Sequence, residues 1–405
     1  MTVPETALPQ PASLRGSNQS GMRAWNERVV LSLVRGQGAL SKADIARTTG
    51  LSAQTVSVIM RALEQDGLLA RGEPVRGRVG QPSVPMSLAA DGAFFLGLKI
   101  GRRSSDMLLT DFQGRVRARR TRRHAWPEPD AAVGFARDAA AELVATLPAA
   151  LQPRLAGMGI AMPFQLWGWA EAIGAPQAAM EAWRGRDIRA EIARDAPWPV
   201  LLQNDATAAC GAELVFGTAP LPRDFVYFYI AFFIGGGVVL NGSLLAGPGG
   251  NAGALGSMPV RAADGGMVQL IDLASIAVLE RALVARGLSP DLLWTSAEAW
   301  HLPPDLLDAW VAGAAQAIAQ AIVASLSVID FPAAVIDGWM PPALRARMAA
   351  AVRSALSGMN LSGLDMPEVL AGTLGPEARP LGAAALPLTS RFLVDQGAFL
   401  SPIEP

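Results

Sequence analysis

The sequence predicts a mixed α/β protein in which a small helical module precedes a larger body. Three short amphipathic helices are expected before residue 70, and from Ala93 onward apolar strands alternate with Ala-rich helices, which is the pattern of α/β architecture. The chain has 405 residues, 51% of them hydrophobic and 17% charged, enough for about two to four domains with cores of their own. A largely disordered chain is excluded, because such chains are poor in apolar residues.

Composition narrows the possible chemistry. The formal net charge is −1, and the chain has one cysteine, Cys210, and two histidines, His124 and His301. A single cysteine excludes an intramolecular disulfide and a cysteine-rich zinc module, and two histidines do not suffice for a His-based metal cluster. We therefore expect no metal, no cofactor and a reducing compartment, the cytoplasm. Cys210 is expected to be a small buried apolar residue.

Neither an export signal nor a membrane helix is expected. Residues 1–21 are rich in Pro, Ser and Gln and have no apolar core, which indicates a disordered tail. The charge-free stretch 225–260 is divided by Gly clusters into pieces shorter than the roughly 20 residues that span a membrane. The stretch 309–329 is long enough, but Gln316 and Gln320 interrupt it, and we interpret it as a core helix.

Residues 22–90 predict a winged helix-turn-helix. A first helix has apolar residues at helical spacing, and Ser41 and Ser52 are placed to cap a second and a third helix, the third ending near Asp66. A Gly-containing turn between the last two helices is the helix-turn-helix arrangement, whose last helix enters the major groove of DNA. The segment 72–85 is rich in Arg and Gly, as expected of a wing that reaches phosphates or the minor groove.

The local charge favours DNA as the partner of this module. Between Met22 and Leu88 there are nine Lys and Arg against five Asp and Glu, and counterion release gives such a patch sequence-independent affinity for DNA. Gln54 and Ser57 are the candidates for base edges, whereas Arg61 and the wing arginines would hold the backbone or minor groove. The alternative is a three-helix protein-interaction module with a solvated polar face. The expected DNA contacts are Ser52, Gln54, Thr55, Ser57, Arg61, Arg76, Arg78 and Gln81.

The body is expected to begin with a three-stranded antiparallel arrangement. Its last strand carries six arginines between Arg115 and Arg123, which we interpret as a solvated strand whose charges discourage edge pairing, with flanking DNA phosphates as the alternative contact. A later strand ends on Asn204 and Asp205, and strand carboxyl ends are where open α/β sheets place ligands. The expected elements are strands at 94–101, 105–111, 115–123, 157–163 and 200–205 and helices at 131–146 and 206–216.

Several Gly- and Ala-rich segments carry a family resemblance: 203–209 (QNDATAA), 234–242 (IGGGVVLNG), 244–247 (LLAG), 253–256 (GALG) and 381–385 (LGAAA). In this order and spacing they resemble the ROK (repressor, open reading frame, kinase) family of bacterial repressors and sugar kinases. The resemblance implies a two-lobed hexokinase/actin-like body, and an N-terminal winged helix is the family's repressor arrangement. Residues 91–200 would form a smaller α/β lobe, completed by a C-terminal helix at 380–400. Residues 201–379 would form a larger lobe with the ligand cleft and the dimerisation surface.

Departures from the family pattern argue against catalysis. Kinases of the family hold ATP with an acidic first hairpin, Asp-x-Gly-Gly-Thr, and this chain has Lys99 in place of the metal-facing carboxylate. A second phosphate loop, Gly-Thr-Gly, reads AFF at 231–233, where phenylalanine side chains would fill the space for phosphate. The adenosine-side glycine pair reads GW at 338–339. Because phosphoryl transfer depends on positioning and charge neutralisation, we expect no kinase activity.

The resemblance also implies a thinned sugar site. Asp205 aligns with the catalytic base, here vestigial, and Asn204 with a sugar-hydroxyl partner, although Asp205 as a mere helix cap is the alternative. Ala254 and Ser257 stand where the family has Glu and His, and residues 261–275 lack the family's zinc-binding Cys and His. The expected ligand contacts are Asn204, Asp205, Gly253, Ala254, Ser257 and Trp169; Trp169, like Trp167 and Trp183, is equally suited to stacking on a ligand or to a core or dimer position.

These observations predict a DNA-binding transcriptional regulator of the ROK type, a repressor, whose catalytically dead, zinc-less body senses a small molecule such as a sugar or a derivative. A homodimer or higher homo-oligomer is expected, because two winged helices about 34 Å apart read a palindrome. The expected partners are double-stranded operator DNA and the effector, with no membrane. The alternatives are an active ROK sugar kinase with an appended DNA-binding domain and an interaction scaffold that does not bind DNA.

Overall fold

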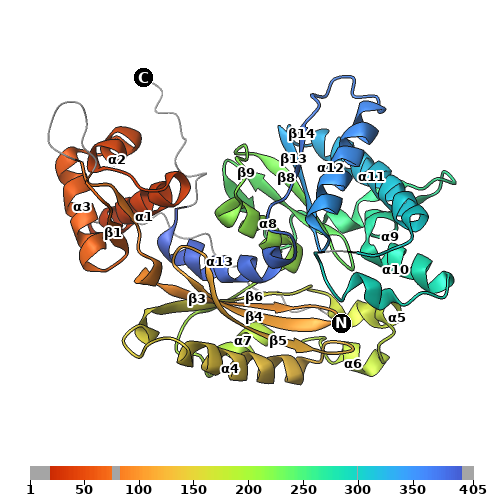
Figure 1. Cartoon of the computed structure of the whole chain (residues 1–405), viewed down its shortest axis with the longest axis horizontal. Helices are drawn as coiled ribbons and strands as arrows, with labels where there is room; N and C mark the ends of the chain where they lie inside the picture. Colours follow the sequence, from red (N-terminus) through yellow and green to blue (C-terminus); the bar gives the residue numbers. More distant parts are fainter. Residues whose placement is uncertain (1–18, 75–82, 299, 395–405) are drawn as a thin grey trace, which may run out of the picture. The chain divides into compact units, whose positions relative to one another are not determined.

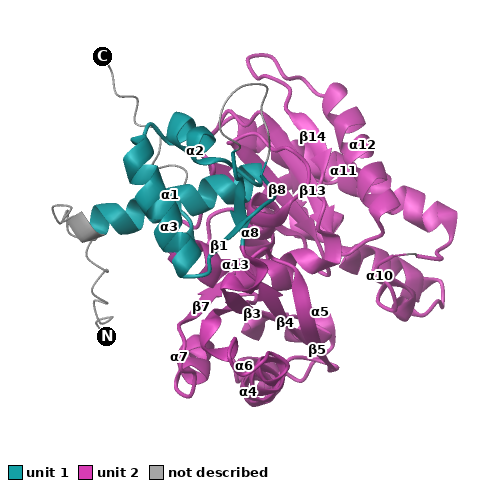
Figure 2. Ribbon diagram, turned by 60° about the vertical axis from the view of Figure 1, so that its left-hand side comes forward, with its two compact units in different colours: residues 1–88, 392–394 teal, residues 89–391, 395–405 magenta. Residues whose placement is uncertain are grey.

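The computed structural model describes residues 19–74, 83–298 and 300–394 (Figure 1). They form two compact units, which Figure 2 shows in different colours. The first unit holds the described residues up to Leu88 together with 392–394, and the second holds residues 89–391.

The first unit consists of three helices and a two-stranded sheet. Its elements are α1 (Gln19–Gln37), α2 (Lys42–Thr49), α3 (Ala53–Gln65), β1 (Leu69–Arg71) and β2 (Met86–Leu88). Ser41 caps α2 in a capping box, since its hydroxyl accepts from the Asp44 N–H and the Asp44 carboxylate accepts from the Ser41 N–H. Ser52 caps α3, so both predicted helix starts are confirmed. Residues 19–21, expected in the tail, already belong to α1, and residues 1–18 lie outside the described part.

An apolar stripe along each helix builds the core of the first unit. Ile45 and Val56 are fully buried, and Ile59, Met60 and Leu63 of α3 are nearly so. β1 and β2 pair antiparallel. The predicted wing between them, at 75–82, falls outside the described residues.

The second unit contains two five-stranded sheets, and the first has the order β5-β4-β3-β6-β7. β3, β4 and β5 form an antiparallel meander to which β6 and β7 add in parallel. β7 brings residues as far as Gln203 into this sheet, so the first lobe extends past the boundary expected at residue 200. Its elements are β3 (Phe94–Ile100), β4 (Ser104–Asp111), β5 (Val116–Arg123), α4 (Pro129–Ala145), β6 (Leu155–Ala161), α5 (Ala170–Ile173), α6 (Gln177–Glu181), α7 (Ile188–Ala193) and β7 (Val200–Gln203).

The arginine run lies on β5, at the edge of this sheet, and most of the strand is exposed. The interpretation as a solvated edge strand is therefore confirmed. Several of its arginines form ion pairs on the same unit: Arg117 with Asp91, Arg119 with Glu377 and Arg120 with Glu142.

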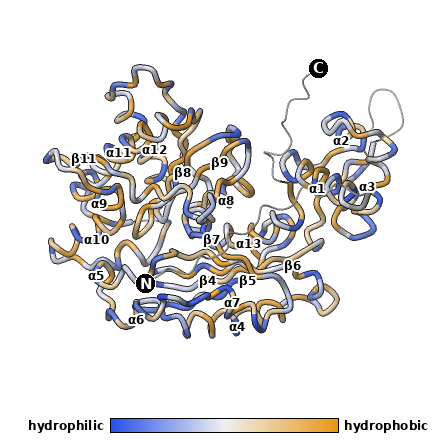
Figure 3. Tube along the Cα trace, turned by 180° about the vertical axis from the view of Figure 1, so that it is seen from behind, coloured by the Kyte–Doolittle hydropathy of each residue, from blue (hydrophilic) through white to orange (hydrophobic). Residues whose placement is uncertain are grey.

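The second sheet has the order β10-β9-β8-β13-β14, with β8, β13 and β14 parallel. Its elements and the helices around it are α8 (Asp205–Phe216), β8 (Phe225–Ile230), β9 (Gly235–Leu240), β10 (Ser243–Leu245), α9 (Leu270–Ala274), α10 (Ile276–Ala285), α11 (Pro304–Leu326), β13 (Ala333–Gly338), α12 (Pro342–Ser357) and β14 (Glu368–Ala371); β11 (Pro259–Arg261) and β12 (Met267–Gln269) form a separate hairpin. Every residue of β8 and β13 is buried, and Figure 3 shows hydrophobic colouring along β8.

The charge-free stretch of the sequence thus forms strands and turns, as predicted. Among the described residues, α11 is the one helix long and apolar enough to cross a membrane by length and composition, and 61% of its apolar window is buried inside the protein. Its buried face joins the core of the second sheet with α12. The prediction of a core helix at 309–329 is confirmed.

The last helix, α13 (Ala378–Phe392), lies against the first sheet at two glycines of its central strands. A Cβ atom added at Gly97 would lie 2.3 Å from the carbonyl oxygen of Pro380, and one added at Gly159 would lie 1.8 Å from that of Ala383. The helix lies on the face of the sheet opposite α4 (Figure 1). It ends at Phe392, before the expected residue 400, and residues 395–405 lie outside the described part.

We predict that Gly159→Ala destabilises the protein by about 1–3 kcal/mol, because the added methyl meets a backbone carbonyl that cannot rotate away. Gly134→Ala is the matched control. Gly134 lies inside α4, and a methyl group added there would have nothing within 4 Å, so the better helix propensity of Ala should stabilise by about 0.5–1 kcal/mol. Urea unfolding of the two variants should therefore show shifts of opposite sign, and equal midpoints would refute the close packing of α13.

Candidate functional site

Helix α3 presents a polar face on the first unit. Gln54 and Arg61 are exposed, and Thr55 and Ser57 are half-buried. The Ser52 hydroxyl accepts from the Thr55 N–H and lies 2.8 Å from the Thr55 hydroxyl, so these two side chains already serve the helix cap. The exposed face leaves Gln54, Ser57 and Arg61 as the described candidates for outside contacts.

One residue of this face was missed by the sequence reasoning. Val58 is 53% exposed although it lies beside the buried Val56 and Ile59. An apolar side chain on a DNA-reading helix is suited to the methyl group of thymine. The signal was available, since Val58 falls outside the helical spacing of the buried stripe. Three other predicted contacts, Arg76, Arg78 and Gln81, lie outside the described residues.

The predicted sugar contacts Asn204 and Asp205 lie where β7 ends and α8 begins. The Asn204 side chain is the helix cap, because its Oδ1 accepts from the backbone N–H groups of Ala206 and Thr207. The cap proposed for Asp205 was therefore placed one residue too late. Asp205 instead forms an ion pair with Arg379, with 3.2 Å between Oδ2 and the guanidinium. Arg379 is 174 residues away in sequence.

The remaining ligand candidates come from two other segments of the second unit. Gly253 has φ +78°, and a Cβ there would lie 2.7 Å from the Cα of Gly237 in β9, so only glycine lets this loop approach the strand so closely. Ala254 and Ser257 are exposed. Trp169 packs edge-on against Phe233 with 4.9 Å between ring centroids.

The two neighbouring tryptophans differ in their surroundings. Trp183 is buried and its Nε1 donates to the carbonyl of Pro127, so it is a core residue. Trp167 is half-buried and, like Trp183, lines a cavity of about 350 Å³, together with Phe164 and Arg189. None of the six predicted ligand contacts lines this cavity.

Lys99 is buried at the end of β3 with a full set of acceptors. Its Nζ donates to the Ser104 carbonyl at 3.2 Å, to the Ser104 hydroxyl at 3.0 Å and to Asp106 Oδ2 at 3.0 Å. Burial would raise the pKa of Asp106, but the charge of Lys99 and hydrogen bonds from Ser104 and Thr121 outweigh it and hold the pKa at about 2. Burial lowers the pKa of Lys99, and Asp106 opposes that shift only in part.

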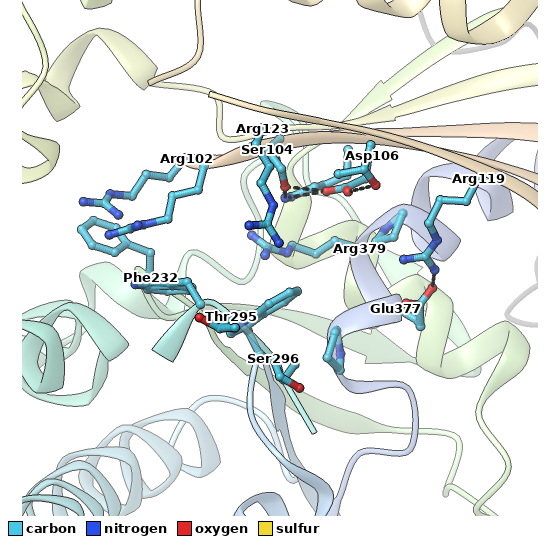
Figure 4. Close-up of a pocket in the computed structure, with 18 of the residues that line it drawn as sticks. Arg102, Ser104, Asp106, Arg119, Arg123, Phe232, Thr295, Ser296, Glu377 and Arg379 are labelled. Atoms are coloured by element: carbon cyan, nitrogen blue, oxygen red, sulfur yellow. Dashed lines mark hydrogen bonds and ion pairs between the residues drawn. The ribbon is translucent and has the colours of Figure 1, made fainter. Parts of the chain in front are cut away.

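A cavity of about 660 Å³ lies next to this ion pair. It is walled by the β3–β4 turn and β5 on one side and by Phe232, Trp294 and Trp339 on the other, and Figure 4 shows Arg102, Arg123 and Arg379 extending into it. The guanidinium of Arg102 lies 4.0 Å above the Phe232 ring. The Phe232 ring is therefore part of the cavity wall.

Buried carboxylates fix the segment that delivers Arg379. Glu213 accepts hydrogen bonds from Thr373 and Leu374, and Asp337 accepts from the Gly375 N–H and the Tyr227 hydroxyl. Burial raises the pKa of Glu213 and of Asp337. These hydrogen bonds hold the turn before α13 in place. They thereby fix the position of Arg379, which lies at the start of α13 and lines the cavity. Among the described residues no group of three or more His, Cys, Asp and Glu could hold a metal ion.

We predict that Asp106→Asn costs about 3–5 kcal/mol of stability, because it leaves the buried Lys99 without its counter-charge. The double variant Lys99→Met/Asp106→Asn should recover much of that loss. Arg120→Gln is the control, since the Arg120 and Glu142 side chains are 55% and 51% exposed and such pairs contribute about 0–1 kcal/mol.

The pH dependence follows from the same pair. The pKa of Asp106 is depressed from 3.8 to about 2 in the folded state, so its stabilisation is present above pH 4 and is lost as pH falls toward 2. In thermal unfolding experiments, the stability of the wild type should fall more steeply across that pH window than the stability of the Asp106→Asn variant. Parallel curves for the two proteins would contradict a strong ion pair.

Comparisons with known proteins match both units. Residues 95–269 match the model of the ROK family, and residues 25–78 match that of the MarR family. The xylose repressor of Bacillus subtilis (strain 168) is 23% identical over 244 residues, which are 60% of this chain and 62% of the repressor. The chain therefore spans less than two thirds of that relative's length.

Solved structures agree with the fold. A ROK family transcriptional regulator described as a homolog of the E. coli MLC protein superposes with a TM-score of 0.65 at 20% identity, covering 93% of this chain and 97% of that chain. A ROK hexokinase from Thermus thermophilus superposes with a TM-score of 0.50 at 25% identity, covering 72% and 96%. The predicted winged helix with a hexokinase-like body is confirmed. Residues 95–269 thus carry a ROK family domain, and residues 25–78 carry a MarR-type winged helix domain at the N-terminus.

Proposed function

We propose that this chain is a DNA-binding transcriptional repressor of the cytoplasm whose ROK body senses a small molecule. The observation that carries the proposal is the exposed polar face of α3, with Gln54 and Arg61 outward, on the third helix of a winged helix domain. The names of a xylose repressor and a ROK regulator among its relatives support the same function.

Recognition of DNA would use α3 in the major groove. Gln54 offers the amide that pairs with adenine, Val58 an apolar contact for a thymine methyl, and Arg61 a charge for the backbone. A single winged helix contacts few base pairs, so we propose a homodimer or higher homo-oligomer that reads two half-sites.

Several features of the body favour sensing of a small molecule over phosphoryl transfer. Asp205, which the resemblance aligns with the catalytic base, has one carboxylate oxygen paired with the guanidinium of Arg379. By the family resemblance, Lys99 takes the place of the kinases' metal-facing carboxylate and Phe232 lies in the second phosphate loop; both residues line the cavity. Phosphoryl transfer depends on neutralising phosphate charge with metal ions and on in-line positioning, which these residues oppose.

The effector would act through the conformational equilibrium of the body. A ligand shifts DNA affinity only if it binds two conformations with different affinity. We propose a sugar or sugar derivative near Asn204, Gly253 and Ser257, and xylose is the first sugar to test because of the relatives' name.

The DNA proposal predicts different effects for residues of one helix. Arg61→Gln should weaken binding to all sequences and lower the slope of log affinity against log salt by about 1. Gln54→Ala and Val58→Ala should change the preferred base at single positions, by about 1–3 kcal/mol. Fluorescence anisotropy with the protein's own upstream DNA and point variants of it measures both.

Arg137→Gln is the matched control, because Arg137 lies on α4 of the second unit and pairs with Asp195. It removes the same charge and should leave DNA binding unchanged. If the α3 variants bind as the wild type does, or if the wild type does not bind DNA at all, the proposal is wrong.

The kinase alternative is tested by a coupled assay with ATP, Mg²⁺ and a panel of hexoses. We expect no turnover above the protein-free background, against the roughly 1–100 s⁻¹ usual for kinases, and no difference between the wild type and Asp205→Asn. Turnover that Asp205→Asn abolishes would establish a sugar kinase.

A further inference from the structure

The cavity of about 660 Å³ is lined by more cationic side chains than carboxylates. Six of its lining side chains are cationic, namely Lys99, Arg102, Arg103, Arg119, Arg123 and Arg379, and four are carboxylates. The cations come from β3, the β3–β4 turn, β5 and the start of α13, so segments far apart in sequence converge on one space (Figure 4).

Most of the nearby carboxylates are already engaged. Asp106 accepts from Lys99, Ser104 and Thr121, and Glu377 pairs with Arg119. Glu280, which does not line the cavity, pairs with both Arg102 and Arg103, and the lining Asp291 pairs with Arg103. These ion pairs therefore neutralise part of the positive charge, but they leave some N–H donors of the arginine side chains unused.

Several arginine donors have no acceptor. Arg102 Nε and one of its terminal nitrogens, Arg103 Nε and Arg379 Nε are buried without a hydrogen-bond partner. In the part of the chain that the structure describes, no hydrogen bond or ion pair involves the Arg123 guanidinium, which is exposed to the cavity. A buried N–H without an acceptor is costly, and most native proteins avoid it. The exposed Arg123 guanidinium is open to an acceptor from outside the chain, and the buried donors of Arg102 and Arg379 would reach such an acceptor by turning toward the cavity.

The donors define the chemistry of that acceptor. Guanidinium groups present N–H donors in a planar fork that matches the oxygens of carboxylate and phosphate. A wall of Trp294 and Trp339, with 6.3 Å between their ring centroids, offers apolar surface to an organic group. Burial and the charges of Lys99 and Arg122 hold the pKa of His124 at about 4, so this lining side chain is neutral at pH 7 and does not add to the positive charge of the cavity.

We propose that this cavity binds a small organic oxyanion, a phosphate ester or a carboxylate, directly on arginine side chains and without a metal ion. A divalent cation would meet the Lys99 ammonium, and three of the four lining carboxylates, Asp106, Asp291 and Glu377, are already paired with cations. The oxyanion would take the free donors of Arg123, Arg379 and Arg102. Because Arg379 also pairs with Asp205, the bound anion would compete with Asp205 and act on the start of α8. That regulatory consequence rests on the proposed repressor function, whereas the binding itself does not.

Calorimetric titration of the full chain tests the proposal. The probes are a hexose 6-phosphate, a hexuronate, the neutral hexose and ADP, each with EDTA and with Mg²⁺. We expect at least one anionic probe to bind in EDTA, no gain on adding Mg²⁺, and no binding of the neutral hexose in this cavity. The probe that binds identifies whether the oxyanion belongs to a sugar phosphate, a sugar acid or a nucleotide.

Arg123→Gln should weaken the anion at least tenfold, because Arg123 is exposed and holds no structural partner. Arg102→Gln is a second variant, in the β3–β4 turn on the same wall of the cavity, and should also weaken it. Arg115→Gln is the matched control, since Arg115 is an exposed arginine just before β5 that does not line the cavity. It should leave the affinity unchanged.

Three results overturn the proposal: no anionic probe binds, binding requires Mg²⁺, or Arg123→Gln and Arg102→Gln both bind as tightly as the wild type. The DNA assay separates this proposal from the proposed function. A protein that binds the anion but no DNA would refute only the repressor, and one that binds DNA but no anion would refute only the cavity proposal.

Discussion

The ammonium group of Lys99 lies buried near the end of β3. It donates hydrogen bonds to the Asp106 carboxylate and to both oxygens of Ser104, and these acceptors compensate its charge. An ammonium at low exposure needs a carboxylate close by, because the cost of burying a charge is offset only by pairing and hydrogen bonds. Once Asp106 is committed to Lys99 it is not available to a metal ion. The same pair therefore stabilises the first sheet and determines which ligands its edge can accept.

A second consequence concerns the strand end where Asp205 lies. Arg379, delivered by a turn that Glu213 and Asp337 hold in place, occupies one oxygen of Asp205. In this body two carboxylates near the cleft are thus each paired with a cation, Asp106 with Lys99 and Asp205 with Arg379. The arrangement leaves both carboxylates with a cationic partner inside the body.

Much of this could be predicted from the sequence, because local chemistry determines it. Ser41 and Ser52 cap their helices as expected, and the arginine run forms an edge strand. The partner of Lys99 could also have been predicted, since the hairpin register places Asp106 directly opposite Lys99. Arg379 was not, because no local pattern links it to Asp205 across 174 residues; only the packing of α13 against Gly97 and Gly159 brings them together. The role of Asn204 as the cap was missed by one residue, a usual uncertainty at helix ends.

The most direct measurement of the central claim is a crystal structure of the protein soaked with ATP and MgCl₂. The account predicts that any ordered phosphate lies on Arg123 and Arg379, with the Lys99–Asp106 ion pair intact and no magnesium ion beside it. A triphosphate with bound magnesium next to Gly101 and Gly235, with Asp106 turned away from Lys99, would contradict it.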